Sequence, residues 1–213
     1  MKPLKQAKPL QSNSRLGDRA PKRILVILGH PQTDSFCGAL AQAYSEAAQI
    51  AGAEVRRINL GELQFDPILW NGYREVQPLE PDLVKAQEDI LWAEHLVLVY
   101  PNWWGGLPAL LKGFCDRVLL PGFAFKYHQQ DPFWDRLLQG RSAQLMVTMD
   151  TPPWYYRWGF KQPGHEQMRR TILEFCGVKP VKILSIGTVR GSSDAQRQQW
   201  LEKVRRMATK TSI

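Results

Sequence analysis

The amino-acid sequence predicts a doubly wound α/β domain, in which helices cover both faces of a five-stranded parallel sheet. Two segments, RILVIL at residues 23–28 and HLVLVY at 95–100, are largely apolar without alternation, which is typical of strands buried on both faces. Such segments alternate along the chain with segments of helical periodicity, and parallel strands require helical crossovers of this kind. We expect the strand order 2-1-3-4-5, in which ligands bind at the carboxyl ends of the strands beside the switch point between the first and third strands.

The expected elements follow one another from residue 23. The predicted strands are residues 23–28, 54–58, 95–100, 144–148 and 182–189. The predicted helices are residues 35–51, residues 81–93, a helix with Pro108 in its first turn, residues 166–175 and a last helix near the carboxyl end. Ser193 and Gln196 have the spacing of a capping box, which predicts where the last helix begins. Residues 59–80 contain several glycines and prolines and are expected to form a loop.

Charge is distributed unevenly along the 213 residues. The net charge is +8, and residues 1–22 and 201–213 account for all of it, with +5 and +3. A protein that binds duplex nucleic acid concentrates positive charge on its folded surface, so we expect no nucleic-acid partner. Residues 1–22 are predicted to be a disordered basic tail because prolines interrupt them, and residues 23–208 are predicted to form one domain.

Segments that direct a protein to or across a membrane are not expected. No apolar run reaches the roughly 20 residues that a membrane span needs, and the first residues lack the apolar core of a secretory signal. The chain has three widely separated cysteines, without the spacing of a zinc site or a disulfide framework. These observations favour the reducing cytoplasm.

The loop after the first predicted strand is a candidate phosphate site. Residues 29–37 read GHPQTDSFC and join a buried strand to a helix, whose first backbone N–H groups have no helical partners. These groups and the helix dipole favour an anion such as phosphate. Ser35 either caps the helix or bonds a phosphate oxygen, and His30 is either a further donor or an ordinary loop histidine. The fingerprints GxGxxG and GxxxxGK[ST] are absent, which excludes the usual modes of binding dinucleotides and nucleoside triphosphates.

The loop after the third predicted strand combines aromatic and flexible residues. Residues 100–108 read YPNWWGGLP, in which two tryptophans precede two glycines. Glycines let the backbone approach a flat ligand closely, and an indole can form a wall beside it. The alternative is that the tryptophans pack against a neighbouring subunit.

Three segments carry a resemblance to known proteins. They are ILVILGHPQTDSF at residues 24–36, EHLVLVYPNWWGGLPALLKGFCDRVLLPGFAF at 94–125, and ILEFCG at 172–177. In these segments, which occur in the right order, the chain resembles the NAD(P)H:quinone oxidoreductases related to DT-diaphorase, including bacterial quinone reductases and drug-activity modulators. The resemblance implies a flavodoxin-like fold, a flavin cofactor (FMN, with FAD as the alternative) and NAD(P)H as co-substrate.

The resemblance also implies roles for particular positions. The flavin phosphate would be held by His30 and Ser35, together with the backbone N–H groups of Phe36 and Cys37. The isoalloxazine ring would lie along Pro101, Asn102, Trp103, Trp104 and Gly105. The pyrimidine end of the ring would meet Thr148, Met149, Asp150 and Thr151. No metal ligand is implied.

The chain departs from the family at two places. Asp150 and Thr151 stand where the family usually has two glycines, and a carboxylate near the reduced flavin would repel its negative charge. We therefore expect the Asp150 side chain to point away, capping the loop of Pro152 and Pro153. The catalytic histidine of the family does not align by spacing, and His165 is the nearest candidate. Tyr156 occupies the place of an aromatic hydroxyl that would bond the acceptor, or it is an aromatic lid without a proton role.

The implied function is two-electron reduction of quinones or similar acceptors. NAD(P)H would deliver hydride to the flavin, and the acceptor would then bind in the same place, a ping-pong cycle in which Tyr156 and His165 donate hydrogen bonds or a proton. The alternative is a flavin-bearing ancillary subunit of a potassium-efflux system. Eight tryptophans and the aromatic segment 123–134 exceed what one small core is expected to bury, which predicts a homodimer.

Overall fold

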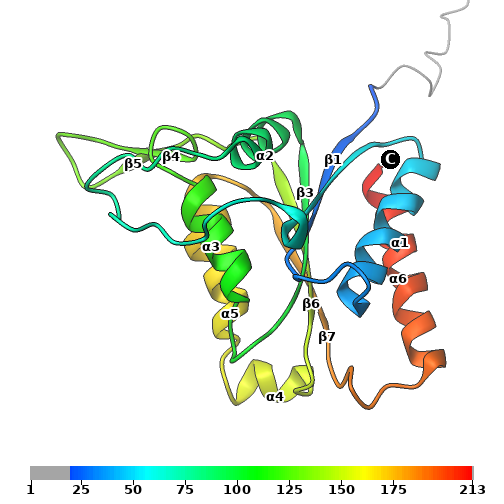
Figure 1. Ribbon diagram of the computed structural model, residues 1–213. Helices are drawn as coiled ribbons and strands as arrows, with labels where there is room; N and C mark the ends of the chain where they lie inside the picture. Colours follow the sequence, from blue (N-terminus) through cyan, green and yellow to red (C-terminus); the bar gives the residue numbers. More distant parts are fainter. Residues whose placement is uncertain (1–19, 213) are drawn as a thin grey trace, which may run out of the picture.

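A computed structural model describes residues 20–212 and contains one parallel sheet (Figure 1). The strands are β1 (Arg23–Leu28), β2 (Glu54–Asn59), β3 (His95–Pro101), β6 (Ser142–Thr148) and β7 (Val181–Ile186). Their order across the sheet is β2-β1-β3-β6-β7, and every neighbouring pair is parallel. The predicted fold class and strand order are therefore confirmed. All but the last three residues of the predicted tail, 1–22, lie outside the described residues.

Helices cover both faces of the sheet. One face is covered by α1 (Phe36–Ile50) and α6 (Asp194–Ser212), which lie side by side (Figure 1). The other face is covered by α2 (Pro81–Trp92), α3 (Ala109–Val118), α5 (Pro163–Glu166) and the π-helical segment η2 (Gln167–Glu174) that continues from α5. Within residues 20–212 no helix has the length and apolar character needed to cross a membrane.

The core lies in two layers, one on each side of the sheet. Along β1, Leu25 and Ile27 pack into the layer beneath α2 and α3, whereas Val26 and Leu28 pack into the layer beneath α1 and α6. Successive side chains of a strand point to opposite faces, so a strand covered on both faces must be apolar at every position. This explains the continuous apolar run at residues 24–28.

Several element boundaries differ from those predicted. β7 ends at Ile186 rather than at residue 189, because the chain leaves the strand through Gly187 and Thr188, whose φ is 55°. The helix predicted at residues 166–175 begins earlier and is π-helical over most of its length. The short helix α4 (Pro153–Trp158), the 3-10 turn η1 (Leu60–Glu62) and the antiparallel hairpin of β4 (Phe125–Tyr127) and β5 (Trp134–Arg136) were not predicted.

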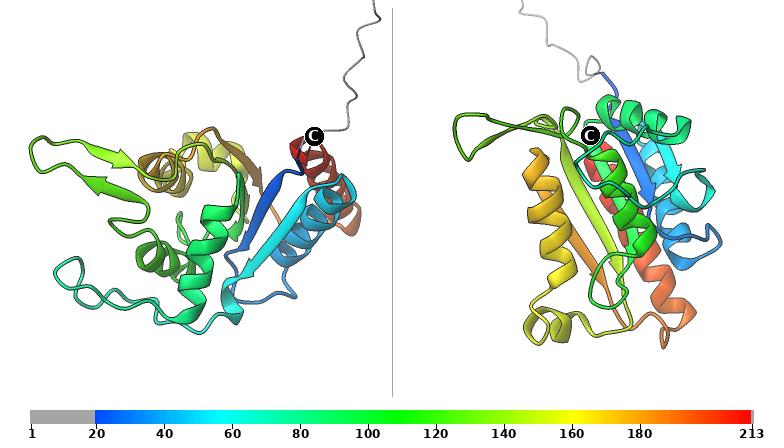
Figure 2. Two further views of the ribbon diagram at one scale, coloured as in Figure 1. Left: turned by 90° about the horizontal axis from the view of Figure 1, so that it is seen from above. Right: turned by 60° about the vertical axis from the view of Figure 1, so that its left-hand side comes forward.

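The long loop between β2 and α2 is fixed by a buried arginine. Arg117 of α3 is fully buried, and its guanidinium donates to the Glu80 carboxylate, at 2.8 Å for Oε2, and to the carbonyl oxygens of Pro78 and Asp66. Figure 2 shows this loop and the β4–β5 hairpin projecting on the side of the sheet away from α1 and α6. Both segments thus extend beyond the two-layered core.

Candidate active site

The first loop leaves free donors at the start of α1. The Ser35 hydroxyl caps the helix by accepting the Gly38 N–H at 3.1 Å, and it donates to the Gln32 carbonyl at 2.8 Å. Among the described residues, the backbone N–H groups of Phe36 and Cys37 donate to no carbonyl or side chain. Two donors at a helix N-terminus therefore remain available to an anion, as the sequence predicted.

His30 is oriented by its own loop. His30 Nδ1 lies 3.0 Å from both the N–H and the carbonyl oxygen of Gln32, and its Nε2 makes no hydrogen bond within residues 20–212. The His30 ring meets the Trp103 indole edge to face, with centroids 5.7 Å apart. This contact brings the first loop against the loop after β3, at the switch point between β1 and β3.

The loop after β3 is a tight turn that exposes its tryptophans. Trp103 and Gly106 exchange two backbone hydrogen bonds of 3.2 and 3.0 Å, and Trp104 and Gly105 between them have φ of 52° and 77°. Trp103 is 45% exposed and the Trp104 indole is fully exposed. Neither tryptophan contributes to the core, so both are free to contact a ligand or another subunit.

Thr148, at the end of β6, connects the two loops. Its hydroxyl lies 3.1 Å from the buried Cys37 sulfur, and its carbonyl accepts the Asn102 N–H at 2.7 Å. Burial raises the pKa of the Cys37 thiol to about 11, so the thiol stays protonated. The side chains of Thr148 and Met149 are both buried, so only their backbone could meet a bound ring.

Tyr156 lies beneath the Trp103–Gly106 turn rather than on its open side. Its side chain is 1% exposed; its hydroxyl donates to the Gly105 carbonyl at 2.9 Å and accepts the Gly164 N–H at 2.9 Å. The Gly164 N–H also lies 2.9 Å from the Gly105 carbonyl. The predicted hydrogen bond from Tyr156 to an acceptor is not supported by this geometry, because the hydroxyl already has both partners. Tyr156 instead fixes the turn that carries Gly105.

His165 packs against Tyr156 and is also buried. The two rings meet edge to face with centroids 5.0 Å apart, and the histidine is 2% exposed. Burial lowers the pKa of His165 to about 4, so the ring is neutral at pH 7. Its Nε2 has no partner in the described part of the chain, and it does not reach the surface. A neutral, enclosed imidazole is a weak proton donor, so the geometry gives little support to the predicted acid role.

Asp150 is engaged by the loop after β7. Its Oδ1 accepts the Arg190 N–H at 2.9 Å. The expectation that Asp150 caps the loop of Pro152 and Pro153 is therefore wrong; those residues begin α4 instead. Thr151 is half-buried, and its carbonyl oxygen lies where a Cβ on Gly187 would collide with it.

The sequence analysis did not identify Gly164 as a site residue, because its role is to lack a side chain where two backbone segments approach closely. A Cβ on Gly164 would lie 2.8 Å from the Gly105 carbonyl oxygen and 3.0 Å from the Tyr156 hydroxyl. Only glycine permits this approach, and the hydrogen bond from Gly164 to Gly105 depends on it. The dipeptide Pro163-Gly164 at the start of a helix was the available signal.

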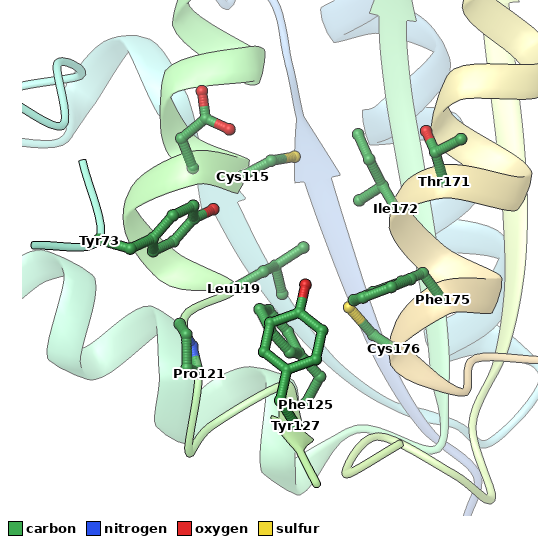
Figure 3. Close-up of a pocket in the computed structure, with 11 residues that line it drawn as sticks. Tyr73, Cys115, Leu119, Pro121, Phe125, Tyr127, Thr171, Ile172, Phe175 and Cys176 are labelled. Carbon is green, nitrogen blue, oxygen red and sulfur yellow. The ribbon is translucent and has the colours of Figure 1, made fainter. Parts of the chain in front are cut away.

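A separate cavity lies away from these loops, between α3, the hairpin and η2. Its volume is about 400 Å³, and Figure 3 shows Tyr73 and Tyr127 on one side of it with Ile172 and Cys176 across from them. The lining is mostly apolar, and it opens beside exposed side chains of the hairpin. Because it shares no residue with the two loops at the switch point, it is not part of the candidate active site.

The fold and the loops together define the class of protein: a doubly wound α/β domain whose ligand-binding edge lies at the switch point between β1 and β3. The chain belongs to the Flavodoxin_2 family, described by its flavodoxin-like fold, whose model matches residues 22–208.

Individual relatives agree with this assignment. An uncharacterized NAD(P)H oxidoreductase of Haemophilus influenzae is 30% identical over 185 residues, which cover 84% of this chain and 90% of the relative. NAD(P)H dehydrogenase [quinone] 1 of Cavia porcellus is 33% identical over 153 residues, covering 61% of this chain and 54% of the relative. The crystal structure of Smu.1420 from Streptococcus mutans UA159 matches with a TM-score of 0.73 at 29% identity, covering 88% of this chain and 98% of that one. The resemblance to NAD(P)H:quinone oxidoreductases is thus confirmed.

Proposed function

We propose that the protein is an FMN-dependent NAD(P)H oxidoreductase that reduces quinones or similar acceptors by two electrons, with NAD(P)H and the acceptor reacting in turn. The observation that carries this proposal is the adjacency of two loops at the switch point: free N–H groups of Phe36 and Cys37 in one, and the Trp103–Gly106 turn in the other. A phosphate cradle beside an exposed aromatic turn suits a flat, phosphate-bearing cofactor. The names of the relatives support the same activity.

The phosphate would bind at the first loop. The N–H groups of Phe36 and Cys37 provide two donors, the Nε2 atom of His30 adds a third when it carries the ring proton, and the dipole of α1 adds a partial positive charge. Ser35 shapes the loop through its cap. FMN needs only this phosphate site, and FAD would need a further pocket for its adenosine.

The isoalloxazine ring would lie along residues 101–105, with its pyrimidine end near the backbone of residues 148–151. When bound, the flavin supplies the redox chemistry: it accepts hydride from NAD(P)H and passes two electrons to the acceptor. The chain itself positions the reactants. Tyr156 and Gly164 hold Gly105, Thr148 holds Asn102, and the fully exposed Trp104 indole would be available to contact the ring or a reactant.

The test of this function is substitution at Ser35. Ser35→Glu should abolish retention of FMN, because it places a carboxylate where the phosphate binds. Ser35→Asp carries the same charge and still caps a helix well, so it separates electrostatic repulsion from loss of the cap. Ser35→Ala should weaken FMN binding without abolishing it. Purified, folded Ser35→Asp with a full complement of FMN would overturn the assignment of the phosphate site.

We also propose that the protein acts as a homodimer in the cytoplasm. Exposed apolar side chains occur on the loop before α2 and on the hairpin: Ile68, Trp70, Tyr73, Tyr127 and Phe133. Of these, Tyr73 and Tyr127 line the cavity of Figure 3. Patches of this kind usually form an interface, and two-fold closure is the commonest. The three cysteines are free and buried, which suits a reducing compartment. Light scattering that finds a fully active monomer on dilution would contradict the dimer.

A further inference from the structure

A groove runs along the outer side of the Trp103–Gly106 turn. Its volume is about 750 Å³, within the range of ligand sites. It is lined by Trp104, Gly105, Gly106, Pro163, Gly164, Glu166, Gln167, Arg170 and Thr171. Two of these residues, Trp104 and Gly105, also belong to the segment 101–105 along which the isoalloxazine ring would lie. The groove is therefore continuous with the proposed ring site.

The wall of the groove holds an indole outward at an energetic cost. Trp104 has a φ of 52°, a left-handed conformation that is strained for a non-glycine residue, and its side chain is fully exposed. The opposite side of the groove approaches a second strained turn, in which Lys161 and Gln162 have φ of 59° and 55°. Strain of this kind persists mainly at ligand sites.

The chain segment that contributes Pro163, Gly164, Glu166, Gln167, Arg170 and Thr171 to the groove carries a net positive charge. Residues 157–171 contain Arg157, Lys161, Arg169 and Arg170 against the single carboxylate of Glu166, a net charge of +3. Glu166 pairs with both Arg169 and Arg170, at 2.6 Å for Arg170 Nε. One carboxylate cannot neutralise two guanidinium groups. The Arg170 side chain remains 67% exposed, and the buried Nε of Arg169 has no partner within residues 20–212.

We propose that this groove binds the adenosine-phosphate half of NAD(P)H, with its phosphate oxygens on Arg170 and its purine against Trp104. The inference rests on the proposed function, because the nicotinamide must lie over the ring site and the rest of the dinucleotide must leave it somewhere. The groove shares Trp104 and Gly105 with that site, the exposed Arg170 guanidinium is opposite in charge to phosphate, and an indole face suits a purine. Two phosphate groups are available: the pyrophosphate common to NADH and NADPH, and the 2′-phosphate of NADPH alone.

The experiment compares Arg170→Gln with two controls in the FMN-loaded protein. Arg170→Lys keeps the charge, and Arg205→Gln removes an equivalent arginine: Arg205 is exposed and paired with Glu202, but it lies on α6, across the sheet from the groove. Calorimetry measures binding of ADP and of adenosine 2′,5′-bisphosphate. Steady-state kinetics measures KM for NADPH, NADH and N-benzyl-dihydronicotinamide, which has no phosphate.

Loss of a charge-assisted hydrogen bond to phosphate should weaken binding about tenfold in Arg170→Gln, and Arg205→Gln should change nothing. Weaker binding of both probes, with KM raised for NADH and NADPH, assigns Arg170 to the pyrophosphate. An effect confined to the bisphosphate and NADPH assigns it to the 2′-phosphate. KM for N-benzyl-dihydronicotinamide should stay unchanged in either case.

The inference is overturned if Arg170→Gln binds both probes as tightly as the unsubstituted protein. That outcome is distinct from failure of the proposed function, in which the unsubstituted protein oxidises none of the three donors. Because calorimetry requires no turnover, it tests the groove even then. Equal thermal unfolding of Arg170→Gln and Arg205→Gln shows that both variants are folded.

Discussion

Removing the Tyr156 hydroxyl tests whether this residue positions the turn at Gly105 or contacts the acceptor. The hydroxyl donates to the Gly105 carbonyl and accepts the Gly164 N–H, both at 2.9 Å, while these two backbone groups also bond each other. Tyr156→Phe therefore leaves neither group without a partner. We expect the free energy of unfolding to fall by about 0.5–1.5 kcal/mol, the net value of one hydrogen bond. For a domain of this size, that corresponds to a melting temperature lower by about 2–4 °C per kcal/mol.

The same change should weaken FMN binding by up to roughly tenfold, because the turn beside the ring loses its support. Tyr155→Phe is the matched control, since Tyr155 is 45% exposed and its hydroxyl makes no hydrogen bond in the described part of the chain. Fluorescence titration measures the FMN affinity, and stopped-flow kinetics separates the two half-reactions. Equal stability and FMN affinity in the two variants would refute the positioning role. A slower reaction with quinone at unchanged FMN affinity would instead restore the direct contact predicted from the sequence.

Two further predictions concern the phosphate loop and pH. Gly38→Ala should reduce FMN binding strongly, because its Cβ would lie 1.9 Å from the Thr33 carbonyl oxygen and force the loop to move, whereas Gly191→Ala, which has no atom within 4 Å, should bind FMN normally in the same titration. Burial lowers the pKa of both His95 and His165 to about 4, against about 6.5 when unfolded. The unfolded chain therefore binds more protons between these values, so the free energy of unfolding should fall as the pH is lowered from 6.5 to 4. Urea midpoints at pH 7 and pH 5 measure this fall, which should be smaller in His165→Gln; an equal fall in that variant would show that His165 is not the group responsible.

The central strands could be predicted because burial on both faces requires apolar side chains along their whole length. Both faces of β1 and β3 are buried, so the residues of each strand are almost entirely apolar. The start of α6 was also predictable, since a capping box is a local interaction: the Ser193 N–H donates to Gln196 Oε1 at 3.0 Å, and the Gln196 N–H donates to Ser193 Oγ at 3.3 Å.

The hairpin could not be predicted because distant contacts stabilise its short strands. Trp134 of β5 stacks on Phe175 with ring centroids 4.4 Å apart, and its Nε1 donates to the Phe175 carbonyl at 2.9 Å. These residues are 41 positions apart, and no pattern within residues 123–136 reveals their contact. The π-helical η2 is a similar case, since its residues have ordinary helical periodicity.

The position of the candidate active site followed from strand order, but the orientation of its side chains did not. The loops after β1, β3 and β6 meet because parallel strands end at one edge of the sheet. Whether Tyr156 faces the ligand or the turn depends on Gly164, which leaves room for the hydroxyl between two backbone segments. The spacing along the sequence predicts that an aromatic residue lies near the ring, but it does not predict which way the side chain of that residue points.

Backbone strain was the least predictable feature of the candidate active site. Within residues 20–212 the non-glycine residues with left-handed φ are Trp104, Lys161, Gln162 and Thr188, all in segments near the carboxyl edge. Glycine adopts left-handed φ readily and other residues rarely do. From the sequence alone, we would therefore not expect this conformation at a tryptophan, lysine, glutamine or threonine. Tyr156 links two of these segments: its hydroxyl bonds Gly105, which follows Trp104, and its carbonyl accepts the Gln162 N–H at 3.1 Å. If the Tyr156 side chain faced the ligand instead, the turn at Gly105 would lose the bond from the hydroxyl, whereas the backbone bond to Gln162 would remain.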